Sequence, residues 1–255
     1  MAPLEIAKVL ARMRMLGVEV GRVHFFPAIP STQDEAVRLA RAGAPEGTLV
    51  IAARQTHGRG RAGRTWFSPA GAGIYASIVL KPKAPPAQWP TLSVLAGVAV
   101  VEELRRLGIR DARLKWPNDA LIGERKVAGI LVQAEPDAGF AVLGLGLNVS
   151  LSGVEMPEGL SATDLETHLP AGTDLEEASA RVLLNILKVY RHAIGDLQVD
   201  PQKVGPLLWT TGEVEVAGVR GRVAGVTPGG ELWLIAEDGH AVAVSVGEVE
   251  DARGG

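Results

Sequence analysis

The chain has 255 residues, carries a formal net charge of −3 at pH 7 and contains no cysteine. The absence of cysteine excludes disulfides, thiol nucleophiles, thiolate zinc sites and iron–sulfur clusters. The acidic total disfavours a protein that coats nucleic acid. The longest apolar run, residues 94–101, is too short to span a bilayer, and the N-terminus has no apolar core of signal-peptide length. We therefore expect a cytoplasmic protein that makes no contact with membranes.

Charge is unevenly distributed along the chain. No Asp or Glu occurs between Gly47 and Val101, and the basic residues of that segment are Arg54, Arg59, Arg61, Arg64, Lys81 and Lys83. A local cationic zone on an acidic protein favours a small anionic ligand over a long polyanion.

Apolar periodicity predicts that helices and strands follow one another along most of the chain, with Ser31 and Asp174 as helix N-caps. The helical pattern covers residues 5–16, 31–43, 90–107 and a segment that begins at Asp174. The strand pattern covers residues 23–29, 48–53, 73–80, 112–116, 127–135 and 139–149. Residues 136–139 predict a hairpin turn between the last two strands.

The pattern changes after about Pro206, where Val, Gly and alternation replace helical periodicity. Turn-forming residues at 228–230 and 238–239 separate the strand-like segments. We therefore expect a main domain over residues 1–206. Residues 207–255 predict a small antiparallel barrel of four or five strands, which is too small to be more than an accessory module.

An Arg–Gly loop occupies residues 58–64, and Trp66 follows it. Its glycines allow tight turns and a close approach of backbone amides to a ligand, and its arginines can grip phosphate or carboxylate oxygens with two hydrogen bonds. The alternative is a mobile surface loop, or an Arg–Gly stretch that contacts nucleic acid. The position of the loop between two well-patterned strands favours the ligand site.

The segment Lys115–Asp119, with the sequence K-W-P-N-D, ends one predicted strand, and Lys126 begins the next. Polar groups at the end of a strand lie at the rim of a sheet, where ligands tend to bind. Asp119 and Lys126 could therefore face one another across a short connection. The alternative is a turn with a solvated salt bridge. Trp116 is expected to be a core residue in both cases.

Glycines interrupt the apolar strand 139–149 in the sequence G-L-G-L-N, which ends at Asn148. A glycine within a strand indicates close approach by a ligand or by another backbone. The alternative is a bulge, or tight packing against a neighbouring helix.

Ser31 and Thr32 stand at the start of a predicted helix. The first is the expected N-cap, and a pair of hydroxyls at this place could also hold a polar ligand.

Taken together, these motifs resemble those of the biotin protein ligases, in order and in spacing. The matching segments are S-T-Q at 31–33, G-R-G-R-A-G-R…W at 58–66, K-W-P-N-D at 115–119, R-K-V-A-G-I-L at 125–131 and G-L-G-L-N at 144–148. The combination is specific, although no single motif is, and it covers residues 23 to 150. The tail resembles the family's SH3-like C-terminal domain. The related lipoate ligases share the fold but lack the Arg–Gly loop and the K-W-P-N-D segment.

The resemblance implies an α+β fold, in which helices flank a mixed sheet as in class II aminoacyl-tRNA synthetases, followed by a small SH3-like β-barrel. It implies activation of biotin by ATP and Mg²⁺ to biotinyl-5′-AMP in the main domain. The biotin is then transferred to a lysine of a biotin carboxyl carrier protein, that of acetyl-CoA carboxylase or a similar carboxylase. Only about 22 residues precede the first predicted strand, so the resemblance is to the monofunctional form without an N-terminal DNA-binding domain.

For the biotin end of the site, the resemblance implies that Ser31, Thr32 and Gln55 form hydrogen bonds with the ureido group. Gly58 and Arg59 would cover the ring. One departure from the family is Gln33, where Asn is common, and we expect it to have only a supporting role.

For the phosphate end, the resemblance implies that Lys126 contacts the biotin carboxylate and the α-phosphate, and that Arg61 and Arg64 close over the same groups. Asp119 would lie near the incoming carrier lysine, and Trp66 near the adenine. Lys126, Arg61 and Asp119 are the expected catalytic residues. The further ligand-site residues are Asn118, Gly129, Gly144 and Asn148, the last near the Mg²⁺ that accompanies ATP, with no metal ligand assigned with certainty.

The loop from His57 to Trp66 is expected to be mobile without ligand. Its three glycines make ordering costly in entropy, and four unpaired cationic or partly cationic side chains would repel one another. A homodimer through the sheet edge is consistent with the family.

Two other functions stay open. One is a lipoate-type ligase of the same fold. The other is a nucleic-acid-binding module, which the acidic total and the lack of interleaved aromatic and basic residues in the barrel disfavour.

Overall fold

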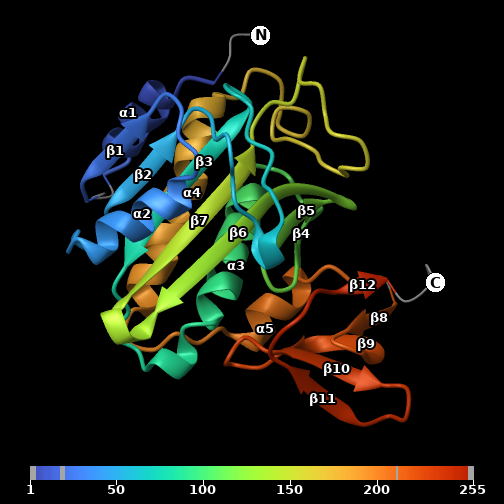
Figure 1. Cartoon of the computed structure of the whole chain (residues 1–255). Helices are drawn as coiled ribbons and strands as arrows, with labels where there is room; N and C mark the ends of the chain where they lie inside the picture. Colours follow the sequence, from blue (N-terminus) through green and yellow to red (C-terminus); the bar gives the residue numbers. More distant parts are fainter. Residues whose placement is uncertain (1–3, 18–20, 211, 252–255) are drawn as a thin grey trace.

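The computed structural model describes residues 4–17, 21–210 and 212–251 and contains two β-sheets (Figure 1). The larger sheet has seven strands in the order β1-β2-β3-β7-β6-β5-β4. β1 pairs with β2 in parallel, and the other neighbouring strands pair antiparallel. The strands are β1 (Val23–Phe26), β2 (Leu49–Ala52), β3 (Gly73–Leu80), β4 (Ala112–Lys115), β5 (Asp119–Ile122), β6 (Arg125–Glu135) and β7 (Phe140–Asn148).

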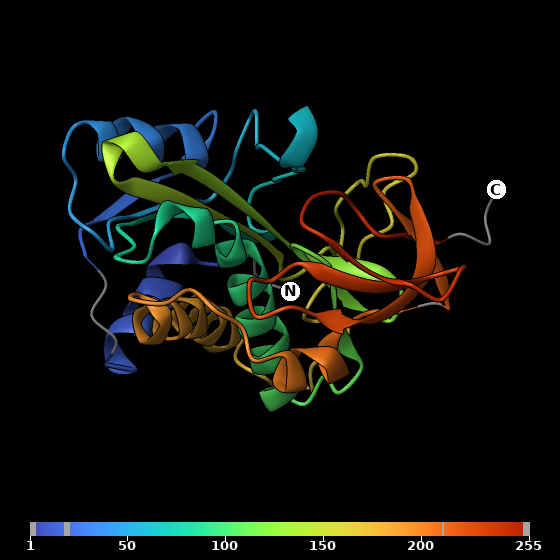
Figure 2. The same cartoon turned by 90° about the horizontal axis from the view of Figure 1, so that it is seen from below.

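Helices cover both faces of this sheet (Figure 2). α2 packs on one face against β2, β3 and β7, whereas α3 packs on the opposite face, and α4 and α1 pack beside it. Ser31 and Asp174 cap α2 and α4, because their side chains accept hydrogen bonds from the backbone N–H groups of Asp34 and Glu177. Both predicted caps are thus confirmed. The helices are α1 (Ile6–Met15), α2 (Thr32–Arg41), α3 (Thr91–Arg106), α4 (Leu175–Ala193) and α5 (Pro201–Val204).

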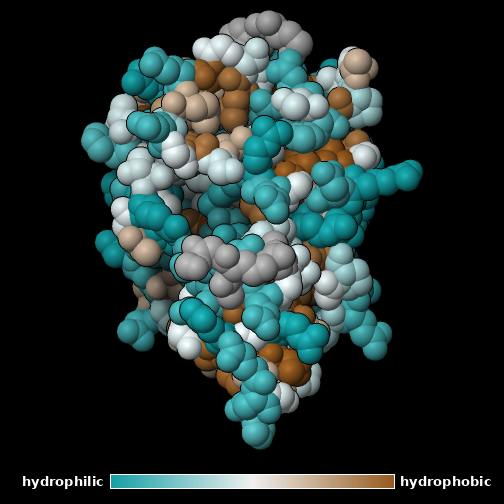
Figure 3. Space-filling model, turned by 90° about the vertical axis from the view of Figure 1, so that its right-hand side faces the viewer, coloured by the Kyte–Doolittle hydropathy of each residue, from teal (hydrophilic) through white to brown (hydrophobic). Residues whose placement is uncertain are grey.

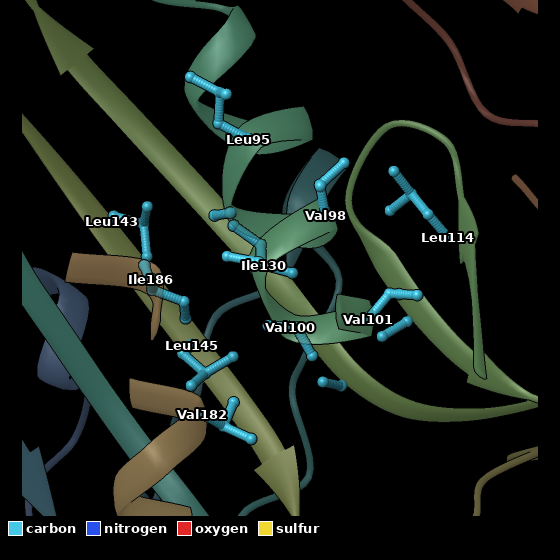
Figure 4. Close-up of a cluster of buried hydrophobic side chains, with 14 of the residues drawn as sticks. Leu95, Val98, Val100, Val101, Leu114, Ile130, Leu143, Leu145, Val182 and Ile186 are labelled. Atoms are coloured by element: carbon cyan, nitrogen blue, oxygen red, sulfur yellow. The ribbon is translucent and has the colours of Figure 1, made fainter. Parts of the chain in front are cut away.

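The main core lies between the seven-stranded sheet and the layer of α3 and α4 (Figure 4). Leu143 and Leu145 of β7 lie beside Val182 and Ile186 of α4, and all four side chains are buried. Because side chains alternate along a strand, these leucines leave the neighbouring glycines of β7 on the opposite face, under α2. The core therefore fixes which face of β7 is available for a site.

The C-terminal sheet has five strands in the order β11-β10-β9-β8-β12, and all its neighbours pair antiparallel. Its inward residues Val214 and Leu232 belong to the same hydrophobic core as α3 and α4. The connecting segment runs beside the edge strand β4 through a parallel bridge between Leu114 and Leu208. The strands are β8 (Glu213–Val216), β9 (Val219–Val226), β10 (Leu232–Ala236), β11 (Ala241–Val244) and β12 (Glu250–Asp251).

Several element boundaries differ from the sequence prediction. The strand predicted over residues 23–29 ends at Phe26, because Pro27 and Pro30 lack the backbone N–H that pairing requires. β5 was not predicted, since its four residues follow a polar motif and show little alternation. Within the described part of the chain, no helix is long and apolar enough to cross a membrane.

Candidate active site

A cavity of about 530 Å³ opens on the α2 face of the seven-stranded sheet, within the size range of small-molecule sites. Its walls come from the start of α2, the Arg–Gly loop, and strands β3, β5, β6 and β7. Ser31 and Gly58 do not line it. The predicted site residues that do line it are Thr32, Gln55, Arg59, Arg61, Arg64, Trp66, Asn118, Asp119, Lys126, Gly129, Gly144 and Asn148.

The two predicted residues that do not line the cavity, Ser31 and Gly58, stabilise the elements that do. Ser31 is 1% exposed, and its hydroxyl is occupied as the cap of α2. Gly58, the first residue of the loop, packs so closely that an added Cβ would be 2.5 Å from the Trp66 carbonyl oxygen and 2.7 Å from the Ser68 hydroxyl. The missing side chain at Gly58 is therefore a packing requirement.

A chain of hydrogen bonds forms one end of the cavity. The Thr32 backbone N–H donates to Gln55 Oε1 at 2.8 Å, and the Gln55 amide donates to Ser68 Oγ at 2.9 Å. The Thr32 and Ser77 hydroxyls lie 3.0 Å apart, and Ser77 donates to Gln33 Oε1 at 3.1 Å. Ser77 and Ser68 were missed at the sequence level. The available signal for Ser77 was a hydroxyl in the middle of an otherwise apolar strand.

Alternation along β7 places Gly144, Gly146 and Asn148 on the cavity side, opposite the core leucines. An added Cβ at Gly144 would lie 2.5 Å from Gln33 Oε1, and one at Gly146 would overlap the Trp66 ring. The pairing of β7 with β6 is continuous, so these glycines do not form a bulge. They allow α2 and the aromatic side chain to approach the sheet closely and keep the cavity floor flat.

Lys126 of β6 and Asp119 of β5 form an ion pair, as expected from the sequence, although the register places Asp119 opposite Gly129. Lys126 Nζ lies 2.7 Å from Asp119 Oδ2, and both side chains are partly exposed toward the cavity. The same ammonium lies 5.2 Å from the centroid of the Trp66 ring, in cation–π range. An added Cβ at Gly129 would be 3.1 Å from Lys126 Nζ. A fixed positive charge is thus held over the floor of the cavity.

Asn118 connects the loop to the sheet. Its amide nitrogen donates to the Ile130 carbonyl at 3.0 Å and to Asp119 Oδ1 at 2.9 Å, and its Oδ1 accepts from the Arg61 guanidinium at 2.7 Å. Burial lowers the pKa of Arg61 from its ordinary value, Asp119 opposes this shift, and Arg64 adds to it. Arg61 is therefore a partly desolvated cation at the edge of the site.

The arginines of the loop have partners, contrary to the expectation that they would be unpaired. Arg59 lies 2.5 Å from Asp34 on α2, and Arg64 forms an ion pair with Glu248 beyond β11. The loop folds as a short hairpin with a 3-10 turn at Arg61–Gly63, in which Ala62 has a φ of 51°. Asp34 and Glu248 therefore offset the mutual repulsion of the loop arginines, which was one reason to expect a mobile loop.

At the far end of the cavity, the Asn148 amide nitrogen donates to the Thr163 carbonyl at 3.0 Å and to the Lys126 carbonyl at 3.3 Å. This orients its Oδ1 away from both carbonyls. The carboxylates that line the cavity belong to Asp119 and Glu158. Among the described residues no group of three or more His, Asp or Glu could hold a metal. This donor set suits an ion held mainly by a ligand's own phosphates.

The segment between β7 and α4 forms an apolar wall that the sequence did not predict. Leu151, Met156, Pro157 and Leu160 line the cavity, and Leu160 is 48% exposed. Asp164 anchors the segment by accepting a hydrogen bond from the Leu151 N–H at 2.8 Å. Figure 3 views the molecule from its right-hand side in Figure 1 and shows brown hydrophobic patches among teal hydrophilic side chains.

A family model described as "Biotin/lipoate A/B protein ligase family" matches residues 25–148, the segment that builds this cavity. A biotin–[acetyl-CoA-carboxylase] ligase from Mycobacterium tuberculosis is 35% identical over 238 residues, which cover 88% of this chain and 86% of that protein. The chain therefore belongs to the biotin/lipoate protein ligase family.

The solved biotin protein ligase from Aquifex aeolicus in complex with biotin and ATP superposes with a TM-score of 0.74 at 29% identity, covering 90% of this chain and 97% of that one. The bifunctional ligase/repressor BirA from Bacillus spizizenii is 39% identical over 71% of this chain and 56% of its own length. The chain thus spans about half the length of such bifunctional relatives. The α+β fold with a C-terminal antiparallel sheet is that of the solved biotin ligases.

Proposed function

We propose that the protein activates biotin with ATP to biotinyl-5′-AMP and transfers the biotin to a lysine of a biotin carboxyl carrier protein. The observation that carries the proposal is the pairing of Lys126 with Asp119 in a cavity whose other end is a neutral network of hydrogen bonds. Such a site is charged where a carboxylate and a phosphate meet and uncharged where a cyclic urea binds. The names of the relatives from M. tuberculosis and A. aeolicus support this choice.

In the proposed first step, a biotin carboxylate oxygen attacks the α-phosphorus of ATP, the bond to the β-phosphate bridge breaks, and pyrophosphate leaves. The reaction brings two anions together, so the site must supply positive charge where negative charge grows. Lys126 is held by Asp119 and Arg61 by Asn118, so neither cation needs to reorganise as the bond forms. Arg64 would add its charge at the same end of the cavity once a ligand phosphate displaces Glu248 from it.

Mg²⁺ bound to the ATP phosphates would neutralise charge on the leaving pyrophosphate. Asn148 is the residue that we assign to that ion, because its amide nitrogen is occupied by two carbonyls and its oxygen is the remaining acceptor. Glu158 of the apolar wall lines the same cavity.

At the other end, we assign Thr32 and Gln55 to the ureido group and Arg59 to the cover over the ring. Ser31 and Gly58 act indirectly, through the cap of α2 and the packing of the loop. Trp66, Gly129 and Gly144 form the flat floor along which the alkyl chain and the nucleotide lie.

In the proposed second step, the amine of the carrier lysine attacks the acyl carbonyl of the adenylate, and AMP leaves. Asp119 pairs with Lys126 at the charged end of the cavity, where its carboxylate would attract the incoming ammonium and accept a proton. We further propose that residues 1–206 form the catalytic domain. Residues 207–255 would form an accessory domain that assists catalysis without contacting the biotin end of the cavity.

Competition between biotin and lipoate tests this assignment against the lipoate-type alternative. The purified protein, ATP and Mg²⁺ are incubated with the carrier domain of an acetyl-CoA carboxylase and with equal concentrations of the two acids. Mass spectrometry should find biotin on the acceptor lysine, and a carrier with that lysine replaced by arginine should stay unmodified. Preferential lipoylation would overturn the assignment of biotin as substrate.

A further inference from the structure

A turn of the C-terminal sheet, residues 228–230, is held by three donors from the main body of the protein. The Trp116 indole N–H donates to the Gly230 carbonyl at 2.8 Å, and the Thr91 hydroxyl donates to the Gly229 carbonyl at 2.7 Å. The Val199 N–H donates to the Pro228 carbonyl at 3.0 Å. Trp116 is 3% exposed, and Gly230 is buried. Trp116 is thus a core residue, as expected, and also part of the joint between the two sheets.

The two residues before Trp116 are held by the C-terminal part as well. The Leu114 carbonyl accepts from the Trp209 N–H at 2.8 Å. The ammonium of Lys115 lies 5.3 Å from the centroid of the Trp209 ring. Three consecutive residues therefore contact the segment that leads into the C-terminal sheet, or the sheet itself.

Asn118 and Asp119, which follow after Pro117, hold the charged end of the cavity. Asn118 binds Arg61, and Asp119 binds Lys126. One side of the K-W-P-N-D segment thus faces the C-terminal sheet and the other faces the site, with a single residue, Pro117, between the two.

The C-terminal sheet also reaches the site from the loop side. Arg61 donates a second, long hydrogen bond of 3.4 Å to the Gly247 carbonyl, and Glu248 pairs with Arg64. The contacts form a closed ring that runs from Gly230 to Trp116, along the backbone to Asn118, to Arg61, and back to the C-terminal sheet.

We propose that Trp116 is a positioning residue for the adenylation step, and that its hydrogen bond to Gly230 sets the place of Asn118 and Asp119. The inference rests on the proposed function and adds that the C-terminal sheet acts on adenylate formation through this side chain. Small errors in the placement of reacting groups lower rates strongly, by roughly 100-fold for about 1 Å. The biotin end, built on α2 and β3, lies outside the ring.

Trp116→Phe removes the donor while keeping an aromatic ring in the core, and the chain offers a matched control. Trp89 is also 3% exposed, and its indole N–H also donates to a backbone carbonyl, that of Ala84, at 3.0 Å. Trp89→Phe therefore makes the same chemical change at an indole that donates to Ala84 instead of to the C-terminal sheet. Both variants should lose a similar amount in melting temperature.

The two variants should differ in the kinetics of pyrophosphate release. For Trp116→Phe we expect kcat to fall by roughly 10- to 100-fold, with biotin affinity by calorimetry within about twofold of wild type. Trp89→Phe should keep the wild-type kcat. Hydrogen–deuterium exchange at residues 118–119 should be faster only in Trp116→Phe. Equal kcat values in the two variants, or a loss of biotin affinity that accounts for the whole effect, would overturn the proposal.

Trp209→Leu gives a second test, at a partly buried residue that packs against the edge of the main core. This test applies if Trp116→Phe does not fold. It removes the ring beside Lys115 without changing the K-W-P-N-D segment, so kcat should fall by several-fold, again at constant biotin affinity. A wild-type kcat in a folded Trp209→Leu protein would contradict the proposal. If the wild-type protein itself releases no pyrophosphate with biotin and ATP, the proposed function fails instead, and the exchange rates at residues 118–119 still test the positioning.

Discussion

Lys126 Nζ lies 2.7 Å from Asp119 Oδ2, and the same ammonium lies 5.2 Å from the centroid of the Trp66 ring. Register places Asp119 opposite Gly129, three residues along β6 from Lys126, and the lysine side chain runs over Gly129 to reach the carboxylate. A carboxylate on one side and an aromatic face on the other fix a cation that would otherwise sample many rotamers. Lys126 is therefore prepared for an incoming anion before any ligand binds.

Lys126→Ala should abolish adenylation while the protein stays folded. Loss of one preorganised charge at a developing oxyanion costs about 2.7–4 kcal/mol, on the order of 100- to 1000-fold in kcat. Pyrophosphate release in the presence of biotin and ATP measures the effect. Lys203→Ala is the control, since Lys203 also pairs with an aspartate, Asp200, but on the exposed surface. Near-normal pyrophosphate release by Lys126→Ala would refute its role.

Arg61→Gly should still form biotinyl-AMP but retain it poorly. Arg61 lies on the loop rather than on a strand, and it is held by Asn118, so we expect it to cover the intermediate more than to assist its formation. Loss of one charge-assisted contact is worth roughly 1.5–3 kcal/mol, or about 10- to 150-fold in residence time. Released adenylate would acylate lysines of bystander albumin, which blotting for biotin detects.

Arg61→Lys is the companion variant, because it keeps the charge but not the two-pronged hydrogen bonding of the guanidinium. Its bystander labelling should fall between that of wild type and that of Arg61→Gly. If Arg61→Gly makes no adenylate at all, Arg61 belongs to the chemical step and the division of roles is mistaken.

Glu248→Gln should loosen the Arg–Gly loop in the absence of ligand. The ion pair with Arg64 is one of the contacts that hold the loop, and its removal leaves that arginine without its anionic partner. Limited proteolysis with trypsin should cut at residues 59–64 several-fold faster than in wild type. Added biotinyl-AMP should slow cleavage in both proteins, because ligand phosphate replaces the carboxylate. Cleavage rates that are unchanged by ligand in both proteins would argue against loop closure.

Asp174→Asn should lower stability at neutral pH but not in acid. The hydrogen bond from the Glu177 N–H lowers the pKa of Asp174 below its ordinary value of 3.8, partial burial opposes this, and Arg12 lowers it further. A lowered pKa stabilises the fold above 3.8, and this contribution is lost as the pH falls through the lower folded value. Asparagine can still cap the helix but cannot form the ion pair with Arg12. We therefore expect the free energy of unfolding of Asp174→Asn at pH 7 to be about 0.5–1 kcal/mol lower than that of wild type.

Chemical denaturation of wild type and Asp174→Asn at several pH values measures this difference. The two unfolding free energies should converge as the pH falls through the lowered pKa of Asp174 in the folded protein. If Asp174→Asn stays less stable than wild type in acid, or becomes still less stable, the assigned direction of the Asp174 pKa shift is contradicted.

Local signals were sufficient for much of the fold. Ser31 and Asp174 were recognisable as caps because the cap and the amide that it accepts from are three residues apart. The short separation of Asp119 and Lys126 in the sequence indicated that they lie close together, whereas the path of the lysine side chain over Gly129 depends on the register. β5 was not recognised as a strand, because its four mostly buried residues follow a polar motif and show little alternation.

Contacts between distant segments were not predictable in the same way. Arg59 and Asp34 are 25 residues apart, and Arg64 and Glu248 are 184 residues apart. Nothing local in the sequence selects one acidic partner among many. The hydrogen bond from Trp116 to Gly230 depends likewise on how the C-terminal sheet packs, so the sequence indicated a core tryptophan and no more.

Adenylate formation is the most direct test of the central claim. The purified protein is incubated with biotin, ATP and Mg²⁺ without any carrier, and the products are separated and identified by mass spectrometry. The account predicts biotinyl-5′-AMP and pyrophosphate in equal amounts, both absent when biotin is omitted. Failure to form biotinyl-5′-AMP in a folded protein that binds both biotin and ATP would contradict it.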